Sequence, residues 1–315
     1  MRSLRYHLYR AKYFFGRALP LSAPVDISLE LSSLCNLHCS YCYHGDPANL
    51  PFKRKFMTWD TAKLILYQAA EAGVSSVKMN WRGESTLSPI FPKVCSYARD
   101  LAGRGIFIDR LTNTNACFPN TADHTFRALA DQTKVKISYD SFNAAVFEAQ
   151  RRGGNHELAT RNIDRFYNWP RRQTELVIQA VRTQANKDED FEGEIKKRWP
   201  SAGLSVRDVV DGRLEKNIES MLVKSRTGRS RQSCLQAHVR LIFDYSGKPS
   251  PCCPDIRNEL VLGDIHETSL VEIFNSAKAR ALRASLKDGT AFAASPCATC
   301  SSHETYRGYT PAWNS

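Results

Sequence analysis

The sequence lacks an uninterrupted apolar run long enough to act as a secretory signal or to span a membrane. Before residue 25, basic side chains interrupt the apolar ones at Arg2, Arg5, Arg10, Lys12 and Arg17. We therefore expect no membrane span. The same stretch fits an amphipathic helix on a membrane surface or a helix packed against the domain that follows. Pro20 and Pro24 favour packing, because they end the helix just before a strand.

Cysteine is too sparse for a fold that disulfides hold together. The chain of 315 residues contains 10 cysteines, and no secretory signal precedes them. Metal-bound thiolates in a reducing compartment are the better interpretation, so we expect a cytoplasmic protein. The hydrophobic content of 42% is enough for one large core or for two domains.

Acidic residues are fewer than basic ones, 32 against 44, which gives a formal net charge of +12. A basic surface can be simple solvation, but a cleft rich in Lys and Arg would attract an anionic substrate. Phosphorylated sugars, nucleotide conjugates and nucleic acid are substrates of this kind. The sequence contains no RNA-recognition motif, no zinc-finger helix and no run of interleaved basic and aromatic residues. We therefore do not expect nucleic acid as a partner.

Three cysteines lie close together in the stretch Cys35-Asn-Leu-His-Cys39-Ser-Tyr-Cys42, and no fourth accompanies them. An ordinary 4Fe-4S electron carrier uses four thiolates, so three ligands would leave one iron open to bind a small molecule. The alternative is half of a zinc site, but zinc loops usually contain C-x2-C or C-x4-C pairs. The C-x3-C-x2-C spacing favours a cluster that takes part in chemistry.

From residue 25 onward, strand and helix patterns alternate, as in a parallel sheet with crossover helices. Six strands predict an α/β fold, a partial (β/α)6 barrel similar to a TIM barrel, with its functional groups at the carboxyl ends of the strands. The expected strands are 25–31, 76–81, 106–112, 135–139, 176–181 and 204–210, and the expected helices include 57–72, 92–102 and 122–130.

Polar residues follow three of these strands. Gly83 and Glu84 come after the second strand, Asn113 lies at the end of the third, and Ser138 and Asp140 close the fourth. A glycine permits close approach of a ligand to the backbone, and a carboxylate accepts hydrogen bonds from an ammonium group. Taken alone, these positions also fit ordinary turns with exposed side chains.

The last third of the chain predicts a small α+β unit with four thiols. A β-hairpin is expected over 238–244 and 248–251, with a glycine turn, followed by a helix over 269–286. Four thiols can converge when the helix folds back, namely Cys234, Cys252, Cys297 and Cys300. Such a set can hold structural zinc or a 4Fe-4S cluster. Cys253 is then a spare thiol.

The two cysteine sets together resemble the radical S-adenosylmethionine (radical SAM) enzymes. The first set matches their cluster loop, with Tyr41 as the aromatic residue before the third cysteine. The second set looks like the twitch domain, the shortened form of the SPASM domain. Gly83 and Glu84 resemble the family's Gly-Gly-Glu-Pro turn, although Arg82 and Ser85 depart from it. The implied domains are a basic helix (1–24), a barrel (25–215), a basic linker (216–232) and an auxiliary-cluster domain (233–315).

The resemblance also implies a role for each candidate residue. One 4Fe-4S cluster, which binds S-adenosylmethionine (SAM), would be held by Cys35, Cys39 and Cys42. An auxiliary 4Fe-4S cluster would be held by Cys234, Cys252, Cys297 and Cys300. Contacts to SAM would come from Tyr41, Gly83, Glu84, Asn113, Ser138 and Asp140. Because no cysteine follows Cys300, we expect a single auxiliary cluster.

An enzyme of this family would cleave SAM to a 5'-deoxyadenosyl radical that takes a hydrogen atom from a substrate. We expect oxidation of a small polar substrate, anionic or carbohydrate-like, with an external electron donor such as flavodoxin or ferredoxin. The alternatives are an epimerase in which Cys253 returns a hydrogen atom, a peptide-modifying maturase, and an electron-transfer protein without radical chemistry. Only a short segment precedes the first strand, which disfavours a peptide-binding module.

Overall fold

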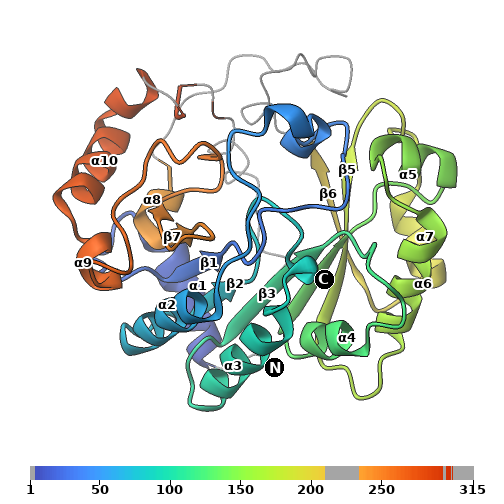
Figure 1. Cartoon of the computed structure of the whole chain (residues 1–315), viewed down its shortest axis with the longest axis horizontal. Helices are drawn as coiled ribbons and strands as arrows, with labels where there is room; N and C mark the ends of the chain where they lie inside the picture. Colours follow the sequence, from blue (N-terminus) through green and yellow to red (C-terminus); the bar gives the residue numbers. More distant parts are fainter. Residues whose placement is uncertain (1–3, 210–233, 294–295, 299, 301–315) are drawn as a thin grey trace.

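The computed structural model describes residues 4–209, 234–293, 296–298 and 300 of the chain. At its centre lies an 8-stranded sheet with the strand order β6-β5-β4-β3-β2-β1-β7-β8. Neighbouring strands are parallel except for the last pair, β7 and β8. Helices cover the outer face of the twisted sheet (Figure 1), so the predicted α/β fold class is confirmed.

The amino-terminal part of the sheet is built from repeated β-α units. Its strands are β1 (Asp26–Leu29), β2 (Ser76–Lys78), β3 (Asp109–Thr114), β4 (Lys134–Ser138), β5 (Glu175–Arg182) and β6 (Gly203–Asp208). Its helices are α2 (Trp59–Glu71), α3 (Phe91–Gly103), α4 (Asp123–Ala130), α5 (Ala144–Gln150), α6 (His156–Tyr167) and α7 (Phe191–Arg198). Short 3-10 helices in the loops are η1 (Tyr43–Gly45), η2 (Pro47–Asn49) and η3 (Ser85–Leu87). Crossover helices of this kind are what parallel strands require.

The two faces of the sheet differ in polarity. On the helix side, Val77, Val135 and Ile137 are buried in the main hydrophobic core. Successive side chains of a strand point to opposite faces, so Lys78 and Lys136 lie on the inner face, where they stay partly exposed. Parallel strands that are covered on both faces are usually apolar throughout. The polar inner face is therefore suited to a ligand.

Helix α1 (Leu4–Phe15) packs its tyrosine face against the amino ends of the strands. The Tyr9 hydroxyl donates to Asp109 Oδ2 at 3.1 Å, and Arg240 Nη2 donates to the Tyr13 hydroxyl at 3.2 Å. The opposite side of this helix leaves Phe15 exposed. Within the described parts of the chain, no helix is both long enough and apolar enough to cross a membrane.

The C-terminal hairpin extends the main sheet instead of forming a separate one. Strand β7 (Arg240–Phe243) pairs in parallel with β1, and β8 (Pro249–Ser250) pairs with β7 in the antiparallel sense. Gly247 forms the turn between them at a φ of 88°. The remaining elements are α8 (Gln236–Val239), α9 (Leu270–Phe274), α10 (Ala277–Asp288) and η6 (Thr290–Ala293). Pairing with β7 satisfies the edge of β1, which would otherwise be open.

Three elements differ from the sequence-based expectation. The hairpin strand expected from residue 238 begins at Arg240, because Gln236–Val239 form helix α8. The third strand begins at Asp109 and not at residue 106, because Phe107 has a left-handed φ of 46° that interrupts extended backbone. The helix predicted over 269–286 is two helices, because the Ser276 side chain accepts a hydrogen bond from Ala279 N and starts a second helix. The predicted basic linker, 216–232, lies outside the described residues.

Replacing Tyr13 by alanine should lower the free energy of unfolding by about 3 kcal/mol, because its buried ring fills the space between α1 and the sheet. Phe15→Ala, on the exposed side of the same helix, is the matched control and should change that free energy by no more than about 0.5 kcal/mol. Urea denaturation followed by circular dichroism measures both. Equal effects would contradict the packing of α1.

Candidate active site at the carboxyl ends of the strands

The cysteine loop follows β1 and is held by the turn after α5. His38 N donates to Arg152 O at 2.7 Å, and Ser40 N donates to Gln150 O at 2.9 Å. The Arg152 side chain donates to the carbonyl oxygens of His38 and Gly45, at 3.0 and 3.1 Å. None of the three cysteines forms a disulfide. Hydrogen bonds to main-chain groups therefore set the shape of the loop.

A buried ion pair lies beside Cys39. Arg151 and Asp140 approach to 2.9 Å, and Arg151 Nη1 lies 4.0 Å from Cys39 Sγ. Asp140 also accepts hydrogen bonds from the Tyr41 hydroxyl and, at 2.8 Å, from Val181 N. The carboxylate is fully buried and protein groups occupy both of its oxygens. In this arrangement Asp140 orients Tyr41 and Arg151 around the loop.

Gly83 brings the turn after β2 onto the start of the cysteine loop. A Cβ atom at this position would lie 2.3 Å from Leu34 O and 2.5 Å from Ser32 O, closer than any side chain permits. The next residue, Glu84, donates its backbone N–H to Leu34 O at 2.8 Å. The glycine is therefore required where two backbones meet, directly before Cys35.

Glu84 is buried and couples the ends of β2 and β3. Its Oε1 accepts from the hydroxyls of Thr86 and Thr114, at 2.7 and 2.9 Å, and its Oε2 accepts from Asn115 N at 2.8 Å. The side-chain nitrogen of Asn115, Nδ2, lies 3.9 Å from Cys35 Sγ. The carboxylate therefore positions Asn115 beside the first thiol of the loop.

Arg82 forms a buried ion pair with Glu30. Two hydrogen bonds of 2.6 and 2.5 Å join the guanidinium to the carboxylate, and the two side chains are 1% and 0% exposed. Arg82 Nη1 also donates to Ile256 O at 2.9 Å, and Tyr245 N donates to Glu30 Oε2 at 3.2 Å. The pair joins the end of β1 to the turn after β2 and to the C-terminal region.

The first three thiols offer a donor set that fits an iron-sulfur cluster. Desolvation raises the pKa of Cys35 to about 12, the nearby Glu84 carboxylate adds to that shift, and burial also raises the pKa of Cys39. Metal binding to thiolates displaces such protons. Among the residues described, no three His, Cys, Asp or Glu side chains are arranged around a single metal ion. A 4Fe-4S cluster instead takes each thiolate on a different iron, and three thiols leave one iron open.

The other four predicted ligands line one small cavity in the C-terminal region. Cys234, Cys252, Cys297 and Cys300 share it with apolar side chains such as Leu286. Desolvation raises the pKa of Cys234 and of Cys297 to about 11, and neighbouring thiols add to both shifts. Four converging thiols in an apolar setting fit the ligands of an iron-sulfur cluster.

Cys253 does not line that cavity. Its backbone N–H donates to Gln236 Oε1 at 3.3 Å, and its carbonyl oxygen accepts from Trp81 Nε1 at 2.9 Å. Burial lowers the pKa of Lys78 to about 8, and Cys253 is among the groups that oppose this shift. The thiol of Cys253 therefore lies within electrostatic reach of the inner face of the sheet.

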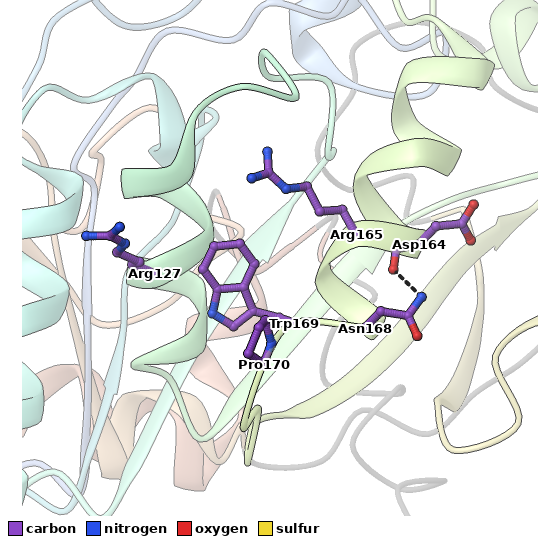
Figure 2. A pocket seen from close by; sticks show the side chains of 6 residues that line it. All are labelled: Arg127, Asp164, Arg165, Asn168, Trp169 and Pro170. Atoms are coloured by element: carbon purple, nitrogen blue, oxygen red, sulfur yellow. Dashed lines mark hydrogen bonds between the residues drawn. The ribbon is translucent and has the colours of Figure 1, made fainter.

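A broad depression of about 690 Å³ lies at the other end of the sheet, near the amino end of β5 (Figure 2). Arg165 in its wall pairs with Asp123 and stacks over Phe126 at 4.5 Å, and Asp164 pairs with Arg198 at 2.7 Å. Asp164 and Arg165 therefore already have partners in the protein. The depression contains no thiol, so the groups suited to cluster chemistry are those at the carboxyl ends of the strands.

Residues 234–301 match the SPASM family, described as an iron-sulfur cluster-binding domain. The match begins at Cys234 and includes all four thiols of the C-terminal cavity. This finding favours iron-sulfur over zinc, which the four cysteines alone left open.

Mycofactocin maturase MftC of Mycolicibacterium smegmatis is 27% identical over 169 residues, which cover 54% of this chain and 40% of that protein. The chain therefore matches less than half the length of this relative. The structure of BtrN in complex with AdoMet and 2-DOIA is similar, with a TM-score of 0.59 at 16% identity, over 88% of this chain and 92% of that one. Streptococcus suis SuiB bound to precursor peptide SuiA gives a TM-score of 0.64 at 15% identity, over 93% and 73%. Both structures show a shared fold.

Residues 234–301 form a SPASM domain, and the comparisons support a radical SAM protein that carries this domain. The three-cysteine loop after β1, the parallel sheet and the SPASM match support the same family. The SPASM match supports an iron-sulfur cluster in this chain, and the BtrN structure of the same fold contains AdoMet.

The structure divides the predicted SAM contacts into two groups. One group surrounds the cysteine loop and comprises Tyr41, Gly83, Glu84 and Asp140. The other lies lower on the inner face, where Asn113 of β3 and Ser138 of β4 are half-buried. The hydrogen bonds of Glu84 and Asp140 go to protein groups, so these two residues position others in this structure. Direct contact of any of the six with SAM stays a prediction.

Sequence reasoning missed Arg151 and Glu30. Arg151 belongs to an Arg-Arg-Gly-Gly run after α5, and this run was the available signal for a specialised turn. Glu30 sits among apolar residues in the expected first strand, where a carboxyl group needs a partner. That partner, Arg82, is the residue that replaces the first glycine of the family's turn.

Arg82→Met should lower the free energy of unfolding by about 3–5 kcal/mol, because it leaves the Glu30 carboxylate buried without its partner. Arg99→Met is the control, since the Arg99 ion pair with Asp131 is exposed and should contribute less than about 1 kcal/mol. The midpoint of urea unfolding reports both changes. A loss at Arg82 no larger than at Arg99 would contradict the importance of the buried pair.

Proposed function

We propose that this protein is an enzyme that cleaves SAM reductively and abstracts a hydrogen atom from a small anionic or carbohydrate-like substrate, giving its oxidised product. The observation that carries the proposal is the position of the Cys35, Cys39 and Cys42 loop, which lies directly against the turn of Gly83 and Glu84. When bound, the cluster supplies the electron for SAM cleavage. The three thiolates would hold it and leave one iron open for SAM.

The protein groups around this loop would position SAM and exclude water. Arg151 places a buried positive charge 4.0 Å from Cys39 Sγ, and Asp140 fixes the direction of that guanidinium. Asn115 lies beside Cys35 with its amide nitrogen toward the sulfur. Hydrogen bonds and charge near cluster sulfurs tune reduction potential, so these two side chains are suited to that task.

Oxidation of a small substrate is supported by the extent of the likeness to BtrN, which covers 92% of that chain and 88% of this one. The polar inner face of the sheet adds to this support, because it offers cations to a charged substrate. Electrons would come from an external donor such as flavodoxin or ferredoxin. None of the ten cysteines is in a disulfide, which fits work in the reducing cytoplasm.

Two further functions have a specific observation in their favour. Peptide maturation is favoured by the match to the maturase MftC and by the fold shared with SuiB. Epimerisation is favoured by Cys253, a thiol near Lys78 that no predicted cluster uses. Solvent deuterium appearing at carbon in the product identifies epimerisation, whereas a two-electron oxidised product without it identifies dehydrogenation.

Wild-type protein, reconstituted anaerobically and supplied with SAM and dithionite, should release 5'-deoxyadenosine. Cys35→Ala should abolish this release, because it removes one of only three ligands of the cluster with the open iron. Cys95→Ala is the control, since Cys95 is buried within α3 in the main core and should not affect release. No release by wild-type protein with both clusters intact would favour the electron-transfer alternative.

Two 4Fe-4S clusters correspond to about eight iron atoms per chain. Cys297→Ala should lower the iron content to about four, because Cys297 lines the cavity of the auxiliary ligands. Cys253→Ala should leave it at about eight, since Cys253 lies outside that cavity. Iron and sulfide analysis of reconstituted protein measures both variants. Equal iron contents in the two variants would contradict the ligand assignment.

A further inference from the structure

Lys78 and Lys136 lie on the same inner face of the sheet, on strands separated only by β3. Lys78 is the last residue of β2, and Lys136 is the third residue of β4. The residues beside them, Val77, Val135 and Ile137, are buried in the core on the helix side. Alternation along a strand therefore turns both lysines away from the helices.

Arg207 of β6 shares this face. Lys136 pairs in register with Val177 of β5, and Arg207 pairs with Val181, which lies four residues further along the same strand. Paired residues of parallel strands, and residues an even number apart on one strand, lie on the same side of a sheet. Arg207 heads the charged groups that shift the pKa of Lys136, so the two side chains approach each other despite their separate strands. Three cations from three strands thus face one region.

These three cations have no anionic partner among the described residues. No described residue forms a hydrogen bond or an ion pair with the side chain of Lys78, Lys136 or Arg207. Two acidic side chains on neighbouring strands form ion pairs with other cations: Asp26 pairs with Arg240 at 2.5 Å, and Glu175 pairs with Lys134 at 3.0 Å.

The cluster is electrostatically unfavourable without a ligand. Burial lowers the pKa of Lys136 to about 7, and the positive charges of Arg207 and Lys78 lower it further. Burial lowers the pKa of Lys78 to about 8, with Arg240 and Arg207 adding to the shift and Asp26 opposing it. Keeping both lysines charged near neutral pH therefore costs free energy, and a bound anion would offset that cost.

The spacing of the two lysines suits one shared ligand. Neighbouring strands lie about 4.8 Å apart, so the β2 and β4 backbones are separated by about 10 Å. Two lysine side chains that extend from such positions can reach a common group between them. Asn113 lies between them on β3, and its buried side-chain oxygen, which has no partner in the structure, can accept a hydrogen bond from a hydroxyl group of the same ligand.

We infer that Lys78, Lys136 and Arg207 form a binding site for a phosphoryl group of the substrate, a diphosphate or a phosphate ester. The inference rests on the proposed function, since it assigns a charge to the substrate of the same active site. The site lies below the strand ends that carry Gly83 and Asp140. A substrate anchored there by its phosphoryl group would extend toward the cysteine loop.

A phosphoryl group fits these cations better than a carboxylate does. Three cations that have no anionic partner among the described residues exceed the single charge of a carboxylate, whereas a diphosphate carries at least two charges near neutral pH. Lysine acts on phosphate as a compact point charge, and arginine binds it through its planar fork. A carboxylate, such as an acidic side chain of a peptide substrate, is the competing occupant.

Binding of inorganic pyrophosphate to the full-length, anaerobically reconstituted protein tests the site by isothermal titration calorimetry. Lys78→Met and Lys136→Met should each weaken binding at least tenfold, and Lys136→Arg should retain most of it because the charge is kept. Lys63→Met and Lys197→Met, on the exposed sides of α2 and α7, are matched controls and should bind as the wild type does. Thermal unfolding of each variant identifies any loss that is due to misfolding.

Three results would overturn the site: no pyrophosphate binding by the wild type, unchanged binding in both methionine variants, or equally tight binding of acetate at the same ionic strength. The last result would assign the face to a carboxylate. These titrations contain no SAM, and the 5'-deoxyadenosine assay contains no pyrophosphate. Loss of the phosphoryl site and failure of the proposed radical chemistry are therefore observed separately.

Discussion

The buried pair of Arg82 and Glu30 is the interaction on which the arrangement of the active site depends. Both side chains are removed from water, so their attraction has to offset the desolvation of two charges. Additional hydrogen bonds from Arg82 to Ile256 O and from Tyr245 N to Glu30 make this possible. One ion pair thereby fixes the end of β1, the turn after β2 and the C-terminal region in a single geometry.

The same pair explains one of the two departures of the turn from the family's pattern, Arg82 in place of the first glycine. A second glycine in place of Arg82 would leave the Glu30 carboxylate without a cation, whereas Gly83 cannot change because any side chain there would collide with the backbone before Cys35. Of the two departures, Arg82 is the one whose side chain points into the joint with the C-terminal region. The position that is kept is the one where two backbones touch.

Much of the fold was predictable from sequence because it follows from periodicity and from cysteine spacing. The alternation of apolar residues predicted β2, β4, β5 and β6 to within a few residues, and the second cysteine set predicted a shared site. Partners distant in sequence were not predictable. No local sequence pattern indicates that β7 pairs with the edge of β1. Nor does one indicate that Arg151 lies beside Cys39 or that protein groups surround Asp140. Such pairings depend on the register of strands that only the folded sheet sets.

The pairing of β1 with β7 has a consequence for chemistry. The cysteine loop leaves the carboxyl end of β1, and the segment with Cys252 leaves the hairpin that β7 begins, so one pair of strands positions the first cysteine set and one member of the second. Trp81 adds a hydrogen bond to the Cys253 carbonyl from the turn that packs against the cysteine loop. A rigid connection of this kind keeps the distance between the two sets constant. The inner face between them is then the part of the site in which we propose that Lys78, Lys136 and Arg207 select the charge of the substrate.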